Sequence, residues 1–442
     1  MTDNIPSTLN DAYDAIDPSI PLEQDDSRYI DFQNVRGEND EISAMVRRIS
    51  RTRDTQYICQ LFTGHRGCGK STELFRLKKK LEDKNFFVVY FDVEQLLDIG
   101  DIDYTDILLA IAEQLESQLR ENAHISIDKK LLEDISKWFS NIVEVEEDSL
   151  EGEIGASAEA GTGVEIPFFA KLFSRVRSDV KTSSLRRTEV RKNLERRSSE
   201  LIERVNELID NAQARLQREG RSGLVLIVDS LEKVRYRVID EESKLNSHTL
   251  LFVENGEHLR SPNCHIVYTF PINLMLNNNI GQIFSQTTIL PMIKINEEAG
   301  NTCDRGREQM YKMLALRINI ESIFSDTNLV DDIISASGGH LRDFLRLVRY
   351  AFDLADEKIT PVHIKKAINK LALEYDYLVK PNDLPRLHTV ARDHQIPSDS
   401  EHALLLYNLL VLEYLNGKRW ADVHPMVKGL SKFKNSKPEV LA

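Results

Sequence analysis

The chain has 442 residues, of which 41% are hydrophobic and 29% charged, and its formal net charge at pH 7 is -14. This length allows two to four domains with their own cores, and the acidic balance argues against a protein that coats nucleic acid by bulk electrostatics. The longest apolar runs, such as residues 86–93, fall well short of the ~18 residues of a membrane span, and no basic and then apolar signal segment opens the chain. We therefore expect a cytoplasmic protein without a membrane span.

Residues 1–28 form an acidic opening segment. Seven Asp and Glu residues fall within positions 1–27, together with no Lys or Arg. Such a composition is typical of a solvated segment that cannot bury much apolar surface. It predicts a flexible acidic tail or a docking peptide, with ordered structure from residue 29.

Residues 64–71 read Gly-His-Arg-Gly-Cys-Gly-Lys-Ser and match the phosphate-binding pattern G-x-x-x-x-G-K-[ST]. An apolar strand over 57–62 precedes them, and apolar residues at helical spacing over 72–81 follow, so a plain glycine turn before a basic helix is the weaker reading. Loop amides and the helix N-terminus hold phosphates, Lys70 reaches the β- and γ-phosphates, and Ser71 binds Mg²⁺. We expect ATP and Mg²⁺ here, in contact with Gly64, His65, Arg66, Gly67, Cys68, Gly69, Lys70, Ser71 and Thr72.

The alternation of strand and helix continues and is then interrupted. A buried strand over 86–93 and a helix over 104–119 precede about a hundred residues without a central strand, an insertion at about 120–222. Small residues over 151–167 predict a hairpin or mobile loop, and a basic run covers 175–197. One long amphipathic helix is predicted over 190–216. The apolar patch at 168–173 is read as an internal or subunit contact rather than a membrane-surface anchor.

The apolar run at 224–228 predicts a central parallel strand, and it ends at Asp229. We expect the carboxylate of Asp229, at the end of this strand, to bind Mg²⁺ together with the Ser71 hydroxyl. Glu232 follows three positions later and could act as the general base that activates water. Its alternative is a solvated acid on the first turn of a helix, where the dipole favours a negative charge.

A further buried strand over 264–270 carries Thr269 near its end. We expect this hydroxyl to face the γ-phosphate; an ordinary threonine at a strand end is the alternative. A short strand over 288–295 follows, and the pattern is helical from residue 297. These elements predict an α/β P-loop NTPase with a parallel sheet sandwiched by helices.

Residues 335–348, Ser-Ala-Ser-Gly-Gly-His-Leu-Arg-Asp-Phe-Leu-Arg-Leu-Val, resemble the helical lid of AAA+ ATPases, and residues 359–368 resemble the end of that lid. Over about 30–375 the chain resembles the AAA+ and STAND P-loop ATPases, the group with Orc1/Cdc6-like and NACHT-like switches. The resemblance implies that Arg342 is the sensor 2 arginine, and Arg36-Gly37-Glu38 loosely resembles the box that holds adenine. Asp-Ser-Leu-Glu at 229–232 is closer to the Asp-Gly-Leu-Asp of STAND proteins, which favours a slow switch over a motor.

The last residues resemble a winged-helix module. An apolar helix is predicted over 402–415, then a turn at 416–417 and a wing strand from 418 to 425. Such modules bind DNA phosphates through wing residues such as Lys418 and Arg419. Acids nearly balance bases here, so protein contact or autoinhibition is at least as well supported.

The predicted domains are the acidic segment 1–28, the ATPase domain 29–295 with its insertion, a lid at 296–378 and a winged-helix-like domain at 379–442. The leading hypothesis is an ATP-binding, slowly hydrolysing switch that couples nucleotide state to homo-oligomer assembly or a protein partner. By fold-level analogy, prokaryotic conflict or defence systems use such switches. The alternatives are a DNA-binding Orc1/Cdc6-like initiator or loader ATPase and a non-hydrolysing, nucleotide-stabilised scaffold.

Overall fold

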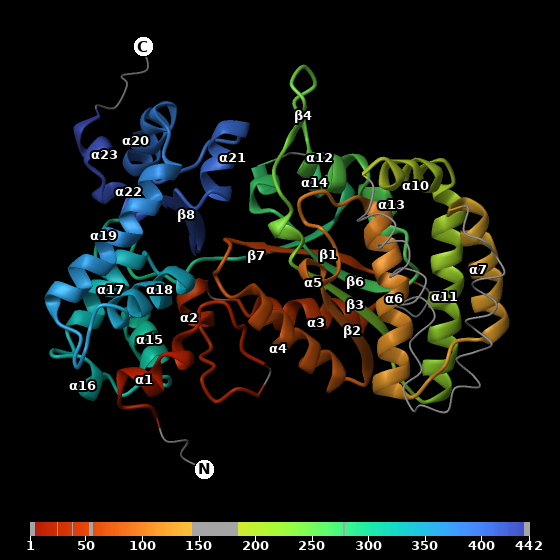
Figure 1. The fold of residues 1–442 in the computed structure, drawn as a ribbon, viewed down its shortest axis with the longest axis horizontal. Coiled ribbons are helices and arrows are strands. Elements are labelled where there is room, and N and C mark those ends of the chain that lie inside the picture. The colour runs from red at the N-terminus through yellow and green to blue at the C-terminus, as the bar shows by residue number, and fades with distance from the viewer. Residues whose placement is uncertain are drawn as a thin grey trace.

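The computed structural model describes residues 5–23, 25–37, 39–52, 56–143, 184–276 and 279–436. Its centre is a five-stranded sheet in the order β2-β3-β6-β1-β7, with every neighbouring pair parallel (Figure 1). A parallel sheet with a phosphate-binding loop after β1 confirms the predicted α/β P-loop NTPase fold. The strands are β1 (Cys59–Gly64), β2 (Phe86–Asp92), β3 (Gly223–Asp229), β6 (His265–Thr269) and β7 (Gln286–Leu290).

Helices cover both faces of this sheet, which explains why β3 is apolar without alternation. Val225 and Ile227 pack in one core with α3 (Glu41–Arg51) and α4 (Lys70–Glu82). Leu224, Leu226 and Val228 pack on the opposite face in a core with α6 (Tyr104–Ala123) and α11 (Ser198–Arg218). All five strand residues are 0% exposed, as expected of a central strand with two buried faces.

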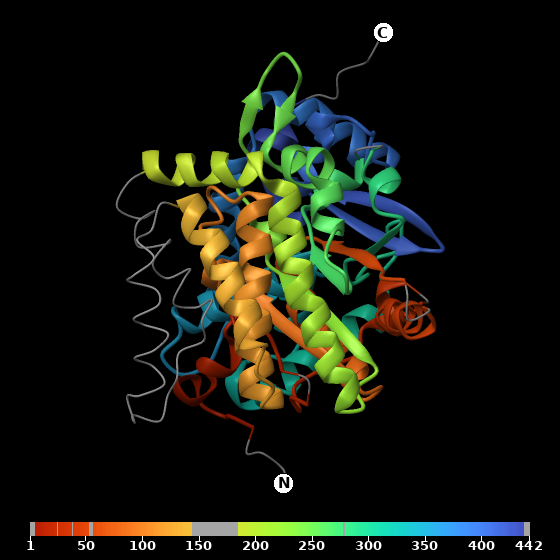
Figure 2. The same cartoon turned by 90° about the vertical axis from the view of Figure 1, so that its right-hand side faces the viewer.

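The insertion adds a helical layer beside the sheet. Helices α6, α7 (Lys129–Val143) and α11 lie side by side, and α10 (Ser184–Arg196) crosses their end (Figure 2). The single helix predicted over 190–216 is wrong, because the chain bends between α10 and α11 at Arg197 (φ -120°, ψ 30°) while the buried stripe continues on both sides. The small-residue stretch at 151–167, the apolar patch at 168–173 and the start of the basic run lie outside the described residues.

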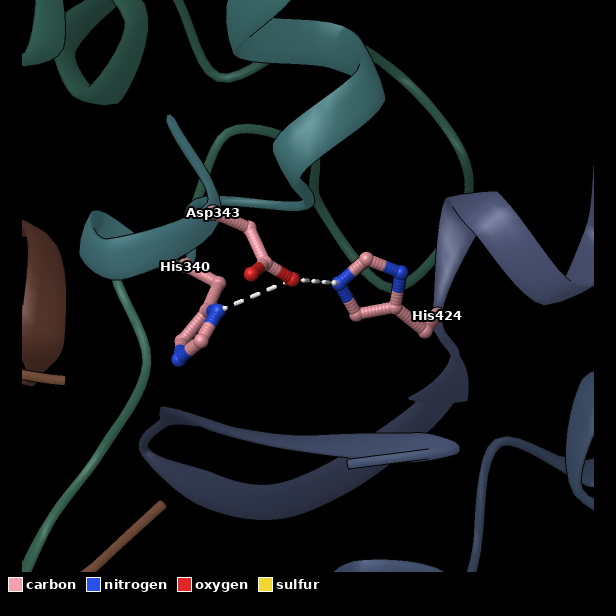
Figure 3. Close-up of side chains that lie close together, drawn as sticks. All are labelled: His340, Asp343 and His424. Atoms are coloured by element: carbon pink, nitrogen blue, oxygen red, sulfur yellow. Dashed lines mark ion pairs between the residues drawn. The ribbon is translucent and has the colours of Figure 1, made fainter. Parts of the chain in front are cut away.

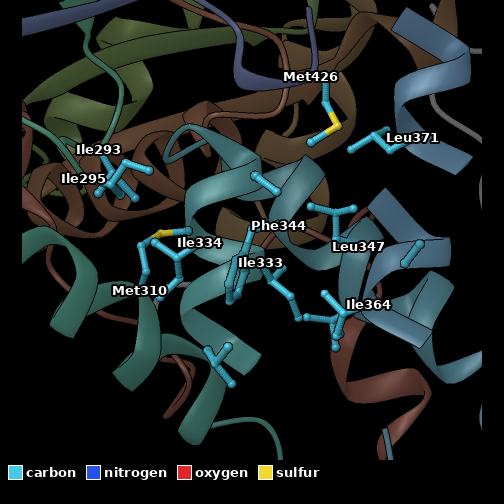
Figure 4. Close-up of a cluster of buried hydrophobic side chains, with 14 of the residues drawn as sticks. Ile293, Ile295, Met310, Ile333, Ile334, Phe344, Leu347, Ile364, Leu371 and Met426 are labelled. Atoms are coloured by element: carbon cyan, nitrogen blue, oxygen red, sulfur yellow. The ribbon is translucent and has the colours of Figure 1, made fainter. Parts of the chain in front are cut away.

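A second, helical core follows the sheet. Apolar residues of α15 (Asp304–Ala315), α17 (Leu329–Ser337), α18 (Leu341–Phe352) and α19 (Pro361–Leu378) meet in one cluster, and Met426 of the C-terminal residues points into it (Figure 4). The predicted glycine turn ends α17 at Gly338 (φ 64°), and Pro361 opens α19 directly after Thr360, both as predicted. These helices are called the lid below.

Residues 5–23 of the acidic opening segment pack against the lid instead of forming a free tail. Residues 5–23 include α1 (Leu9–Ala12) and the short helix η1 (Asp14–Ile16), and Ala12 and Ile16 are 0% exposed within the lid core. Asp17 pairs with Arg349 of α18 at 3.2 Å. The composition of this segment predicted that it would be solvated, because its few apolar residues did not indicate a surface on which they could be buried.

Residues 380–436 form what is called here the C-terminal unit. The helix predicted over 402–415 is wrong: α21 (Ser400–Tyr407) stops, Leu409 takes a positive φ of 60°, and β8 (Val411–Asn416) pairs with β9 (Lys418–Val423) in an antiparallel hairpin. The apolar run fitted either a helix or a buried strand, and pairing with β9 decided it. The turn at 416–417 is as predicted. The unit's other elements are η5 (Pro381–Asp383), α20 (Leu384–Asp393), α22 (Pro425–Gly429) and α23 (Ser431–Asn435).

A second hairpin, β4 (Val238–Asp240) with β5 (Leu245–Asn246), projects from the domain that contains the parallel sheet (Figure 1). In the part of the chain that the structure describes, no helix is long and apolar enough to cross a membrane. The remaining short elements are α2 (Gln33–Arg36), α5 (Val93–Leu96), η2 (Leu231–Lys233), α12 (Ser247–Thr249), η3 (Leu250–Glu254), α13 (Gly256–Arg260), η4 (Ile272–Leu276), α14 (Ile280–Ile283) and α16 (Ile320–Ile323).

Candidate nucleotide-binding site

The phosphate-binding loop joins β1 to α4 and depends on two glycines with positive φ. Gly67 has φ 83°, and Gly69, which precedes the first turn of α4, has φ 100°. A Cβ on Gly67 would lie only 2.6 Å from the Cβ of Arg342, so only glycine fits between the loop and the lid. The loop therefore presents backbone N–H groups and a helix N-terminus, the geometry that binds phosphate.

Lys70 is held in the centre of the site. Its ammonium donates hydrogen bonds to the carbonyl oxygens of Gly64 and His65, both at 3.1 Å. It also pairs with Glu232 Oε1 at 3.0 Å, and its side chain is only 2% exposed. A buried positive charge of this kind is positioned to meet the β- and γ-phosphates of a triphosphate.

Asp229 and Ser71, the predicted Mg²⁺ ligands, lie together. The Ser71 hydroxyl is a hydrogen-bond partner of Asp229, and the Tyr90 hydroxyl donates to Asp229 Oδ2 at 2.7 Å. Burial and the nearby charge of Glu232 raise the pKa of Asp229 to about 6, although the hydroxyl groups of Ser71 and Tyr90 oppose this rise. A hydroxyl and a carboxylate side by side fit a hard cation such as Mg²⁺.

Glu232 reaches the site through a tight turn after β3. Ser230 takes a positive φ of 69° and leads into η2, which carries Glu232. The residue is 5% exposed, and Oε2 has no hydrogen-bond partner among the described residues. Burial acts to raise its pKa, but the Lys70 ammonium holds that pKa below its usual range. Glu232 is thus a buried carboxylate inside the site and not a solvated acid on a helix.

Thr269, at the end of β6, lies behind Glu232. Its hydroxyl oxygen accepts a hydrogen bond from the N–H of Leu231 at 2.9 Å, and the hydroxyl is also a partner of the Glu232 carboxylate. In this arrangement Thr269 fixes the turn that carries Glu232. Contact between Thr269 and a γ-phosphate stays a prediction.

The predicted loop residues divide between two faces. Gly67, Gly69, Lys70, Ser71 and Thr72 line a cavity of about 680 Å³ together with Arg342 of the lid and with residues 14–15 and 17–22 of the opening segment. The opening segment is fixed there because the Thr72 hydroxyl accepts a hydrogen bond from the N–H of Leu22 at 3.1 Å. Apolar lining suited to a nucleotide base comes from Ile20, Pro21, Leu22, Ile30, Phe32, Met313, Leu341 and Leu345.

The side chains of His65 and Arg66 turn to the opposite face and contact the C-terminal unit. His65 Nε2 accepts a hydrogen bond from the N–H of Glu413 at 2.9 Å. The Arg66 guanidinium donates to the Glu232 carbonyl at 3.1 Å and to the Tyr407 hydroxyl, and it lies over the Tyr407 ring at 4.3 Å. Two residues predicted to contact nucleotide therefore join the loop to the end of the chain.

Sequence reasoning missed two cavity residues as site residues. Arg36 is 6% exposed, and it donates from Nη2 to the Cys68 carbonyl at 2.6 Å, while Nε and Nη1 have no partner among the described residues. Its signal was the loose resemblance of Arg36-Gly37 to an adenine box. Tyr90 gave no signal, because nothing in a buried strand marks one tyrosine as the neighbour of Asp229.

No protein-family model matches this sequence, and no curated protein matches it. Solved structures similar to it include the Aeropyrum pernix ORC2 protein in ADPNP-ADP complexes, at 12% identity over 95% of each chain with a TM-score of 0.43. The Walker-type ATPase of Pyrococcus abyssi is 13% identical over 94% of this chain and 99% of that one, with a TM-score of 0.44. Cdc6p from Pyrobaculum aerophilum is 13% identical over 95% and 96%, with a TM-score of 0.37. At these values the likenesses establish nothing about activity.

Proposed function

We propose that this chain binds ATP with Mg²⁺, hydrolyses it slowly and acts as a nucleotide-dependent switch. The observation that carries the proposal is the meeting of two separate segments: Lys70 pairs with Glu232, and Ser71 contacts Asp229. Lys70, Ser71 and Glu232 line one cavity, and Asp229 is buried directly behind Ser71. A structural ion pair alone would not need the loop glycines, the hydroxyl beside Asp229 or the unpartnered carboxylate oxygen of Glu232.

Each residue of the site has its own role in the proposed hydrolysis. The γ-phosphate competes with Glu232 for the Lys70 ammonium, which frees the Glu232 carboxylate for a water molecule. The water oxygen forms the new bond to the γ-phosphorus, the bond to the ADP oxygen breaks, and Glu232 takes the proton. Ser71 and Asp229 would hold Mg²⁺, which neutralises developing charge on the phosphates.

Slow turnover follows from the partners of Glu232. The carboxylate is engaged by Lys70, and its backbone carbonyl is held by Arg66, so the base is restrained by the loop that receives the substrate. We infer that the lid, at 296–378, closes the site and that the end of the chain, at 379–442, is the output element of the switch. Its output is the assembly of copies of this chain or the binding of a protein partner, the mode of STAND-type switches.

The test combines three measurements on the purified chain. Equilibrium binding of a fluorescent ATP analogue with Mg²⁺, phosphate release, and the molecular mass in solution with and without ATP are measured on the same sample. The expected results are saturable binding, slow phosphate release, and a change of mass or shape with ATP. Tight binding without phosphate release would select the non-hydrolysing scaffold, and no binding would contradict the proposal.

A DNA-binding initiator or loader is the second candidate, and one observation favours it. Lys418 lies beside the turn of the β8–β9 hairpin with its side chain 67% exposed. Against this, Lys418 pairs with Glu298 at 3.0 Å, and Arg419 Nε donates to Glu413 Oε1 at 3.1 Å. Salt-dependent DNA binding that is lost on Lys418→Ala with Arg419→Ala, but kept in a Lys78→Ala control, would support this candidate.

A further inference from the structure

Three buried side chains form a path from the C-terminal unit to the phosphate-binding loop. His424 Nε2 lies 3.4 Å from Asp343 Oδ2, and His340 Nδ1 lies 3.2 Å from the same oxygen (Figure 3). The other nitrogen of His340, Nε2, lies 2.6 Å from the carbonyl oxygen of Arg66 in the loop. Both histidines are 0% exposed and Asp343 is 2% exposed, so water does not compete for these contacts.

Two histidines and a carboxylate are also ligands that a divalent metal could take, and their ligand atoms all lie within 4.8 Å of one another. The hydrogen-bond partners argue against this. His424 Nδ1 accepts a hydrogen bond from the N–H of Met426 at 3.1 Å, so the proton of a neutral ring sits on Nε2 and is directed toward Asp343. A metal on Nε2 would need that proton on Nδ1, where it would face the Met426 N–H.

The remaining contacts describe an anion surrounded by donors. Burial acts to raise the pKa of Asp343, but His340 and His424 hold it well below its usual range. Tyr375 donates its hydroxyl to Asp343 Oδ2 at 2.6 Å, and Arg346 donates to Oδ1 at 3.3 Å. Asp343 thus stays a carboxylate that orients the His340 ring. Both nitrogens of that ring face acceptor oxygens, Nδ1 toward Asp343 and Nε2 toward the Arg66 carbonyl, so these contacts need a proton on each nitrogen, and the Nε2–H then points at the Arg66 carbonyl.

The Arg66 carbonyl matters because a trans peptide is planar. When that oxygen points to His340, the N–H of Gly67 in the same peptide points the opposite way. The next carbonyl, of Gly67, accepts a hydrogen bond from the backbone N–H of Arg342 at 3.2 Å. Two successive loop peptides are therefore oriented by the start of α18, and this orientation decides where the loop presents its donors to a phosphate.

We propose that His340 is a positioning residue for the phosphate-binding loop, and that Asp343 and His424 make its orientation depend on the seating of the C-terminal unit. The inference rests on the proposed nucleotide site and adds the route by which that site is regulated. Undocking of the C-terminal unit removes His424 from Asp343, loosens His340 and weakens nucleotide binding. By linkage, bound nucleotide stabilises the docked C-terminal unit by the same factor.

The test measures the affinity of wild type and variants for the fluorescent ATP analogue with Mg²⁺. His340→Ala is expected to weaken binding about tenfold, and His424→Ala three- to tenfold although it does not line the cavity. The double variant is expected to bind like His340→Ala alone, because both changes break one path. His340→Gln, which keeps an N–H donor, is expected to recover most of the affinity.

His388→Ala is the matched control, since His388 is a partly buried histidine of the C-terminal unit that stacks on Phe433 away from the loop. It is expected to leave affinity unchanged. If His424→Ala fails to fold, His424→Gln replaces it. Unchanged affinity in the folded His424 variant, or additive losses in the double variant, would overturn the inference while wild-type binding still supports the nucleotide site.

Metal analysis of the same wild-type sample tests the alternative directly. We expect that the wild-type protein does not contain one equivalent of bound zinc, whether or not the sample is first treated with a chelator. One equivalent of zinc that disappears in His424→Ala would overturn the hydrogen-bonded path and assign a metal centre to these residues. Absence of ATP binding by the wild type would remove the proposed function and this inference together.

Discussion

The two faces of the phosphate-binding loop have different partners. Toward the cavity, Lys70 and Ser71 meet the acids at the end of β3, all from the domain that contains the parallel sheet. On the opposite face, His65 and the Arg66 side chain meet β8 and α21 of the C-terminal unit, and the Arg66 carbonyl meets the lid. The first face holds the groups proposed for phosphate chemistry, and the second joins that loop to residues more than 270 positions later. Variants on the two faces should therefore change different quantities.

Lys70→Ala tests the cavity face with the largest expected effect. Loss of the buried ammonium should weaken ATP binding at least a hundredfold, because a charge-assisted contact to phosphate is removed. It also leaves Glu232 without its ion-pair partner, which costs about 3–5 kcal/mol of stability for a buried charge. Binding is measured by equilibrium titration and stability by urea denaturation.

The control for this variant is Lys79→Ala, on the same helix but with a side chain 42% exposed. Lys70→Ala combined with Glu232→Gln should recover stability without recovering binding. Wild-type affinity in Lys70→Ala would show that the cavity face does not bind phosphate.

Glu232→Gln separates binding from chemistry on the same face. The amide keeps the shape of the side chain but cannot accept a proton, so phosphate release should fall about a hundredfold. ATP affinity should stay within a few-fold of wild type, since Lys70 remains in the loop. Glu257→Gln, an acid with a side chain 73% exposed, is the matched control. Turnover at the wild-type rate would exclude Glu232 as the base.

The cavity face could be predicted from the sequence because its signals are local. A loop pattern between a strand and a helix, and an acid at the end of an apolar run, each lie within about ten residues. The structure brings Asp229, Glu232 and Lys70 together because parallel strands end at the same edge of the sheet. Tyr90 could not be predicted, since its contact with Asp229 depends on the register between β2 and β3.

The second face could not be predicted for a different reason. His65 and Arg66 occupy variable positions of the loop pattern, so the pattern assigns them to phosphate and says nothing of Tyr407 or Glu413. Their partners lie on elements whose type was itself ambiguous, since the predicted helix over 402–415 contains β8. Long-range packing, which decides both the strand and the contact, leaves no local trace.

Acid pH should weaken the second face through its buried histidines. Burial, with positive charges nearby, lowers the pKa of His65 to about 3, and burial lowers that of His248, which lies against Tyr407, to about 4. Below the unfolded value of about 6.5 the unfolded chain takes up protons that the folded chain does not, so stability falls as pH falls. Each of these two histidines should lower the free energy of unfolding by about 1.4 kcal/mol at about pH 5.5.

Urea denaturation at pH 7.5 and 5.5 measures this loss. His248→Gln should show a smaller loss between the two pH values, because one of the two neutral histidines is gone. His388→Gln serves as its control, since His388 is a partly buried histidine that contacts Phe433 and Ser436 and not Tyr407. An equal loss in wild type and His248→Gln would show that this histidine is not held neutral in the folded protein.

Tyr407→Phe has the smallest expected effect and tests the link between the two faces most directly. It removes the hydroxyl that receives Arg66 and donates to the Val234 carbonyl at 3.1 Å, but keeps the ring under the guanidinium. Loss of these hydrogen bonds should cost about 1 kcal/mol. Arg66 also holds the Glu232 carbonyl, so part of the cost should appear as a few-fold change in ATP affinity or phosphate release.

Tyr377→Phe, at a tyrosine that is 90% exposed, is the matched control and should change neither quantity. The informative measurement is the ratio of the two effects in Tyr407→Phe. Reduced stability with unchanged affinity and turnover would mean that the second face only packs the C-terminal unit against the loop. A change in affinity or turnover at a residue that does not line the cavity would mean that the loop transmits the seating of that unit to the phosphate side.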